Sequence, residues 1–120
     1  MTALRLPGVH FSHSPSFPLL RAAVEYGEKT GARMHVGSVF TSDAFYAPDP
    51  SVTERLTALG TLAVEMEAAG LYAVGAAEGI ETLMVGTVSD LLDGRGEMTA
   101  EQRETTFEAM VEIALAAIQS

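Results

Sequence analysis

Three polar or aromatic clusters follow apolar stretches of this chain, and they are the places where chemistry could occur. Ser89-Asp90 comes directly after the most apolar run, Glu65-Met66-Glu67 follows a shorter one, and Phe45-Tyr46 lies in a loop rich in Ser, Asp and Pro. Alternating strands and helices are expected around them, and in open α/β sheets ligands bind beyond the carboxyl ends of the strands. These three clusters are therefore the candidates for a substrate site.

Asp90 is the strongest of these candidates because an arginine is expected to face it. Taken alone, an acid after a buried strand is explained equally well as a turn residue. Arg103, however, lies four residues before Phe107, on the helix face that we expect to be buried, and in a first turn where the helix dipole disfavours a cation. Since the intervening loop returns to the same end of the sheet, we expect Arg103 to face Asp90. The alternative is an Arg103 side chain that extends into solvent.

The other two clusters keep alternative interpretations. Glu65 and Glu67 are two residues apart, so only one of them can point inward if the strand continues through both. The alternative is an ordinary acidic first turn of a helix, which the helix dipole stabilises. Phe45 and Tyr46 could form a stacking wall for a planar ligand, or could simply anchor their loop in the core.

Composition and motifs exclude several other classes of function. A net charge of −9 argues against binding to nucleic acid or to anionic lipid, and the absence of cysteine excludes thiolate chemistry. His10 and His13 stand in irregular, proline-flanked sequence that does not favour a metal site, and no glycine-rich nucleotide motif occurs. No apolar run approaches the roughly 20 residues that span a bilayer. We therefore expect a cytoplasmic chain with no metal ion, no nucleic-acid partner and no membrane contact.

The positions of apolar residues, caps and glycines predict an α/β domain with helices on both faces of a sheet. Gly70 and Gly75 lie inside one predicted helix, where each costs roughly 1 kcal/mol relative to Ala, so we expect close packing against a strand at both positions. Capping boxes are expected at Ser51 with Glu54 and at Thr99 with Gln102. The expected strands are 4–11 (an edge strand), 33–40, 62–66 and 82–88 (buried on both faces), and the expected helices are 16–30, 51–60, 67–79 and 99–118.

Four blocks of sequence make the chain similar to a known family. They are Phe40-Thr41-Ser42-Asp43-Ala44-Phe45-Tyr46, Val64-Glu65-Met66-Glu67-Ala68-Ala69-Gly70, Thr87-Val88-Ser89-Asp90 and Arg103-Glu104-Thr105-Thr106-Phe107. In type, order and separation they resemble the bacterial high-molecular-mass, hexameric type of purine nucleoside phosphorylase. The resemblance implies a three-layer α/β/α fold with a mixed sheet, and cleavage of the purine–ribose bond by phosphate, which acts as co-substrate without a cofactor.

The resemblance also implies a role for each candidate. Asp90 would protonate the purine at N7, and Arg103 would hold and polarise that acid. In the rest of the pocket, Phe45 would stack on the base, Met66 would pack beneath the sugar and Glu67 would bind ribose hydroxyls, with Glu65 and Ser89 lining the same pocket. Proton transfer of this kind typically accelerates a reaction by about 10²- to 10⁴-fold.

The similarity covers only the C-terminal half of the family's chain, so residues 1–120 are expected to form one partial domain, truncated at its N-terminus, that binds the nucleoside. The phosphate site of the family lies in the other half, and nothing here matches it. One alternative is therefore a half-domain that is noncatalytic or depends on a partner. The other is a nucleosidase of the same fold, which uses water. Unpaired strand edges predict association, either with another copy of the chain or with a complementary N-terminal chain.

Overall fold

A computed structural model describes residues 7–44, 49–92 and 99–120 of the chain. The chain forms two compact units, and each of them combines two separate stretches of sequence. The first unit covers the residues up to Ser16 together with His35–Leu83, and the second covers Phe17–Met34 together with Met84–Ser120. That the whole chain belongs to one domain stays a prediction.

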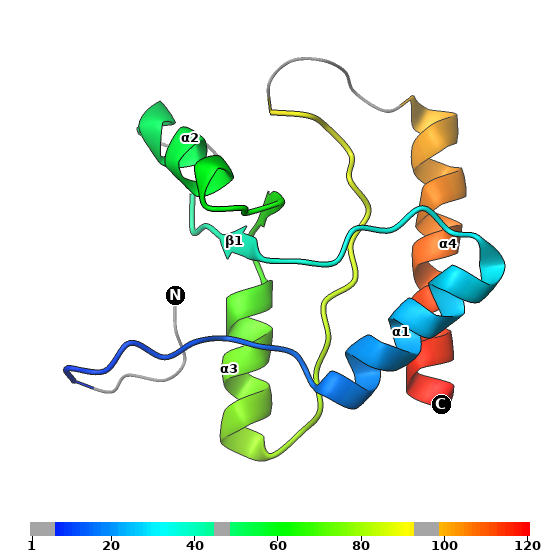
Figure 1. The fold of residues 1–120 in the computed structure, drawn as a ribbon, viewed down its shortest axis with the longest axis horizontal. Helices are drawn as coiled ribbons and strands as arrows, with labels where there is room; N and C mark the ends of the chain where they lie inside the picture. The colour runs from blue at the N-terminus through cyan, green and yellow to red at the C-terminus, as the bar shows by residue number, and fades with distance from the viewer. Residues whose placement is uncertain (1–6, 45–48, 93–98) are drawn as a thin grey trace. The chain divides into compact units, whose positions relative to one another are not determined.

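The first unit is built on a small parallel sheet. Its strands are β1 (Val39–Thr41) and β2 (Ala63–Glu65), which are joined through α2 (Pro50–Ala58). Such a crossover connection is what a parallel pair requires. The register pairs Thr41 with Glu65, so the last residues of both strands lie side by side (Figure 1). Both strands are shorter than predicted: residues 33–38 lie outside β1, which extends one residue further, to Thr41, and Leu62 and Met66 lie outside β2.

The N-cap of helix α2 lies two residues earlier than the sequence pattern predicted. Asp49 is its N-cap, and the Asp49 carboxylate accepts a hydrogen bond from the Ser51 amide at 2.9 Å. The expected capping box at Ser51 and Glu54 is therefore wrong. Pro50 explains the difference, since proline is preferred at the first helical position, where its missing N–H costs nothing and its fixed φ suits the helix.

Helix α3 (Ala68–Glu78) follows β2 directly and ends at Gly79, which adopts the left-handed conformation that favours glycine there. The expectation of close packing holds at Gly75, where a Cβ atom would lie 2.7 Å from the Thr82 side chain and 2.9 Å from the Ile80 carbonyl oxygen. It is wrong at Gly70, since no atom of residues 7–44, 49–92 or 99–120 beyond its own surroundings lies within 4 Å of the position that a Cβ atom would take. The chain that packs on Gly75 is irregular and is not a strand.

The second unit consists mainly of two helices, α1 (Phe17–Thr30) and α4 (Ala100–Gln119), which pack against each other (Figure 1). Both were predicted, including the capping box in which Thr99 and Gln102 each bond the other's amide. Each helix buries one side, as expected of amphipathic helices that pack together. The buried residues are Ala23 and Gly27 on α1 and Ile113 and Ala117 on α4.

Two of the strand predictions are wrong within the described residues. Thr82–Val88 forms no regular strand and is only half-buried, with Val88 58% exposed. Residues 7–11, the described part of the expected edge strand, are irregular as well. Apolar sequence favours an extended conformation, but a strand also needs a neighbour that accepts and donates its backbone hydrogen bonds. The regular sheet pairing in the described chain involves β1 and β2 alone.

Candidate functional site

The second unit brings Asp90 and Arg103 together, as the topology predicted. Arg103 Nη2 lies 3.4 Å from Asp90 Oδ1, across the residues that join the segment 84–92 to α4. The contact is long for a charge-assisted hydrogen bond. About half of each side chain is exposed, 52% for Arg103 and 50% for Asp90. An ion pair in water is worth little, so this pair does not hold the unit together.

Arg103 pairs with Asp90, but the burial of Arg103 that was expected to cause the pairing is absent. Arg103 was expected on the buried face of the last helix, in line with Phe107. Phe107 is 55% exposed, and the side of α4 that packs on α1 carries Ile113 and Ala117 instead. The two residues nevertheless meet because Asp90 is exposed on the same unit and the carboxylate satisfies the guanidinium in the first turn of α4.

The first unit contains a tighter cluster around Glu65. The Thr41 hydroxyl donates a short hydrogen bond to Glu65 Oε1. The other carboxylate oxygen, Oε2, accepts from the amides of Glu67 at 2.7 Å and Ala68 at 2.6 Å. Thr41 Oγ1 in turn accepts from the Ala69 amide at 3.0 Å. The carboxylate of Glu65 therefore joins the ends of β1 and β2 to the first turn of α3.

These contacts change the acidity of Glu65. Burial by itself would raise its pKa, because it disfavours the charged form. The Thr41 hydroxyl and the amides of Ala68, Glu67 and Met66 act in the opposite direction, since they donate to the ionised carboxylate, and together they hold the pKa of Glu65 below its ordinary value. Glu65 is thus a carboxylate that the fold stabilises in its charged state.

Glu67 and Met66 lie beside this cluster in a different environment. Glu67 is the N-cap residue of α3, but its side chain makes no capping hydrogen bond and is exposed. The Met66 side chain is 42% exposed. The question of which acid points inward therefore has an answer: Glu65 is turned into the fold, and Glu67 points toward solvent.

The first turn of α3 is already occupied by groups of the chain itself. Free amides at a helix N-terminus are a ready site for an anion. Here Glu65 takes up the amides of Glu67 and Ala68, and Thr41 takes up that of Ala69. A carboxylate in the same place would also repel a phosphate. The turn is therefore not a phosphate site.

The remaining candidates are placed less fully. Ser89 is exposed beside Asp90 in the second unit. Phe45, with Tyr46, lies outside the described residues. Among residues 7–44, 49–92 and 99–120, no group of three or more His, Asp or Glu side chains could hold a metal ion. No helix in the described part of the chain is long and apolar enough to cross a membrane.

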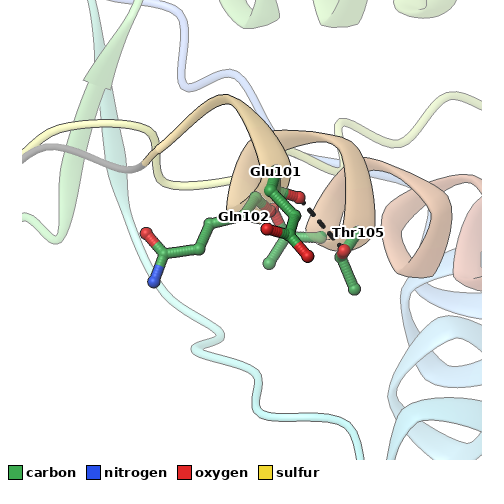
Figure 2. A pocket seen from close by; sticks show the side chains of 4 residues that line it. Glu101, Gln102 and Thr105 are labelled. Atoms are coloured by element: carbon green, nitrogen blue, oxygen red, sulfur yellow. Dashed lines mark hydrogen bonds between the residues drawn. The ribbon is translucent and has the colours of Figure 1, made fainter.

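A hollow on the surface of α4 contains none of the candidate residues. Figure 2 shows that its lining comes from successive turns of one helix, with Glu101, Gln102 and Thr105 around it. Thr105 also donates to the Glu101 carbonyl oxygen at 3.1 Å, a bond within the helix (Figure 2). These groups provide no convergent set of donors, as a binding site needs.

The sequence of the chain is similar to that of known proteins. The sequence profile of the phosphorylase superfamily matches residues 6–120, so the chain belongs to this superfamily. That membership, together with helices around a parallel sheet, confirms the predicted α/β fold class.

Individual relatives of the chain share a description that is narrower than the superfamily. A protein of Hahella chejuensis described as a DeoD-type purine nucleoside phosphorylase is 48% identical over 95% of this chain and 48% of its own length. A protein of Colwellia psychrerythraea with the same description is 45% identical over 95% of this chain and 49% of its own. A protein of Bacillus cereus with the same description is 43% identical over 99% of this chain and 51% of its own length. The chain thus spans about half the length of the curated relatives it matches, which confirms the predicted resemblance to half of a purine nucleoside phosphorylase.

Proposed function

We propose that this chain supplies the base- and ribose-binding half of a purine nucleoside phosphorylase. The observation that carries the proposal is the contact between Asp90 and Arg103, 3.4 Å apart, in a chain 48% identical to a relative described as such an enzyme. A phosphate oxygen attacks C1′ of the ribose as the bond from C1′ to the purine breaks, and the bonding electrons go to the base. Asp90 gives its proton to N7 of the purine. The products are ribose 1-phosphate and the free base.

Arg103 assists that proton transfer. As Asp90 loses its proton it becomes a carboxylate, and a guanidinium within hydrogen-bond reach stabilises the charge that develops. The arginine acts at the moment of reaction, so the pair need not be buried or strong beforehand. On the sugar, Glu67 accepts hydrogen bonds from ribose hydroxyls, Met66 packs beneath the ring, and Glu65 and Ser89 line the pocket. Phe45 stacks on the base.

The phosphate that drives this reaction is a co-substrate, and its site belongs to a complementary N-terminal chain. An exposed apolar stripe on α4 supports such a partner, because contiguous apolar surface marks an interaction site. Four side chains form the stripe, at helical spacing and each at least 37% exposed: Phe107, Val111, Leu115 and Ile118. The apolar segment 82–88 supports the same conclusion, since it lies outside the regular sheet pairing of the described residues and is suited to become a strand once a suitable neighbour is present. A second copy of the chain is the alternative occupant.

Complementation tests the function. The chain is combined with the N-terminal half of the Hahella chejuensis relative, and base release from inosine and adenosine is measured with and without phosphate. We expect no turnover from the isolated chain and phosphate-dependent turnover from the complex. Release at the same rate without phosphate would assign a nucleosidase instead. A stable complex without any turnover would leave the noncatalytic half-domain as the function.

Sedimentation of the isolated chain tests the apolar stripe. We expect association that weakens when Leu115 is replaced by Glu, since a charge in the stripe opposes burial. Glu112→Gln, one turn away on an exposed position, is the matched control. A chain that stays monomeric at high concentration, and that does not bind the N-terminal half either, would contradict the assigned surface.

A further inference from the structure

Thr41 was given no role in the sequence analysis, yet it connects β2 with α3, the two elements for which we propose ribose contacts. Its hydroxyl donates to Glu65 Oε1 and accepts from the Ala69 amide at 3.0 Å. The sheet register explains the first contact, because Thr41 and Glu65 are partners in a parallel pair and their side chains point to the same face. The second contact reaches into the first turn of α3.

Thr41 and the α3 amides together fix both oxygens of Glu65. One oxygen is held by the hydroxyl, and the other by the amides of Glu67 and Ala68. A carboxylate held in this way has one orientation, and it cannot turn toward a sugar without breaking three hydrogen bonds. Glu67 differs: its amide is held by Glu65, while its carboxylate is exposed and makes no capping bond.

We propose that Thr41 is the positioning residue of the ribose site: it clamps Glu65 onto the first turn of α3, which orients Glu67 as the carboxylate that binds ribose hydroxyls. Glu65 itself then lines the pocket without binding the sugar. This inference rests on the proposed function for the identity of the ligand, but the clamp is a property of the free chain. The hydroxyl is the essential group, so serine can replace threonine and valine cannot.

The first arm of the test measures the clamp without any substrate. The pKa of Glu65 is followed by carbon NMR of its carboxyl group in the free chain. Removing one donor to the charged form raises the pKa. We expect Thr41→Val to raise the pKa of Glu65 and Thr41→Ser to leave it at the wild-type value. An unchanged pKa in Thr41→Val would overturn the clamp, and so would a Thr41→Ser variant that behaves like valine.

The second arm measures how the contact between Thr41 and Glu65 affects binding of the ribose, in the complex with the N-terminal half. We expect Thr41→Val to raise KM for inosine about tenfold, as for one weakened hydrogen bond to a charged group, with a smaller change in kcat. The inhibition constant of 2′,3′-dideoxyinosine, which lacks both hydroxyls, should not change, and Thr41→Ser should restore inosine binding. Equal weakening of both nucleosides would show a merely structural role and overturn the proposal.

The two arms separate the clamp from the function. A wild-type complex that does not turn over would overturn the proposed function and the ribose role with it. The NMR result on the free chain would still decide whether Thr41 holds Glu65.

Discussion

The two acidic clusters of this chain differ in how much of their structure is in place. Both carboxylate oxygens of Glu65 accept hydrogen bonds within its own unit. One accepts from the Thr41 hydroxyl, and the other accepts from the amides of Glu67 and Ala68. Among the described residues, the Asp90 carboxylate forms an ion pair with Arg103 at 3.4 Å, and half of the Asp90 side chain is exposed. A carboxylate that organises the fold needs its partners before the substrate arrives. For Asp90, the proposed role is to give away a proton, and such an acid does not need fixed donors to its charged form before the substrate binds.

The largest effect expected from this comparison is on catalysis. In the complex with the N-terminal half, Asp90→Asn should lower the rate of phosphorolysis by about 10²- to 10⁴-fold, because asparagine cannot protonate the base. The rate of base release from inosine is the measurement. Glu108→Gln, an exposed carboxylate on α4, is the matched control and should keep the wild-type rate. A near-normal rate in Asp90→Asn would remove Asp90 from the mechanism.

A smaller effect, on stability, should appear at the other cluster. Glu65→Ala leaves the amides of Glu67 and Ala68 without their acceptor, as when a capping residue is lost, and should cost roughly 1–2 kcal/mol in the free energy of unfolding. Urea unfolding of the free chain measures it. Glu67→Ala, two residues away and exposed, should stay within about 0.5 kcal/mol of wild type. Equal losses of unfolding free energy in Glu65→Ala and Glu67→Ala would mean that the hydrogen bonds of Glu65 do not stabilise the chain.

The dependence of stability on pH should show that the charged form of Glu65 stabilises the fold. Because folding lowers the pKa of Glu65, its contribution to stability is fully present above the ordinary value of about 4.3 and is lost as the pH falls through the lower folded value. We expect the stability gap between wild type and Glu65→Gln to be constant from pH 7 to about 5 and to close below about 4. A gap that persists in strong acid would show that the charge of Glu65 is not what stabilises the turn.

The smallest effect on stability should be at the pair of Asp90 and Arg103, for which we propose a role in catalysis. Arg103→Gln in the free chain should change the free energy of unfolding by no more than about 0.5 kcal/mol, because the ion pair is half-exposed and screened by water. Urea unfolding at low and high salt measures it. A loss several times larger would mean that Asp90 and Arg103 are structural, and the contrast between the two clusters would disappear.

Much of the helical structure was predictable because its signals are local. Helix α4 begins at the capping box of Thr99 and Gln102, and α3 ends at Gly79, as short-range hydrogen bonding and backbone sterics require. The start of α2 was misplaced because two local signals competed, and Asp49 with Pro50 prevailed. The approach of Arg103 to Asp90 was also predictable from chain order, although the burial that was meant to explain it is absent.

Strands were less predictable because pairing is not local. The apolar run Thr82–Val88 was expected to be a buried strand, but within the described residues it takes no part in regular sheet pairing, although the Ser16 amide donates to the Thr82 carbonyl oxygen at 2.8 Å. Thr41 was missed for the same reason. Its importance follows from a register that sets it beside Glu65, 24 residues away, and the only signal in the sequence was its place in the block Phe40–Tyr46 that resembles the family.

The amino-acid sequence alone determined the superfamily and most helix limits, because each depends on residue identity and short-range spacing. The tertiary structure decided the surroundings of each acid. Glu65 and Glu67 are equal in composition and nearly equal in position, and only the parallel pairing of β1 with β2 makes the first a partner of Thr41 and leaves the second exposed. A carboxylate's role is set by the donors around it, and those donors come from parts of the chain that only folding brings together.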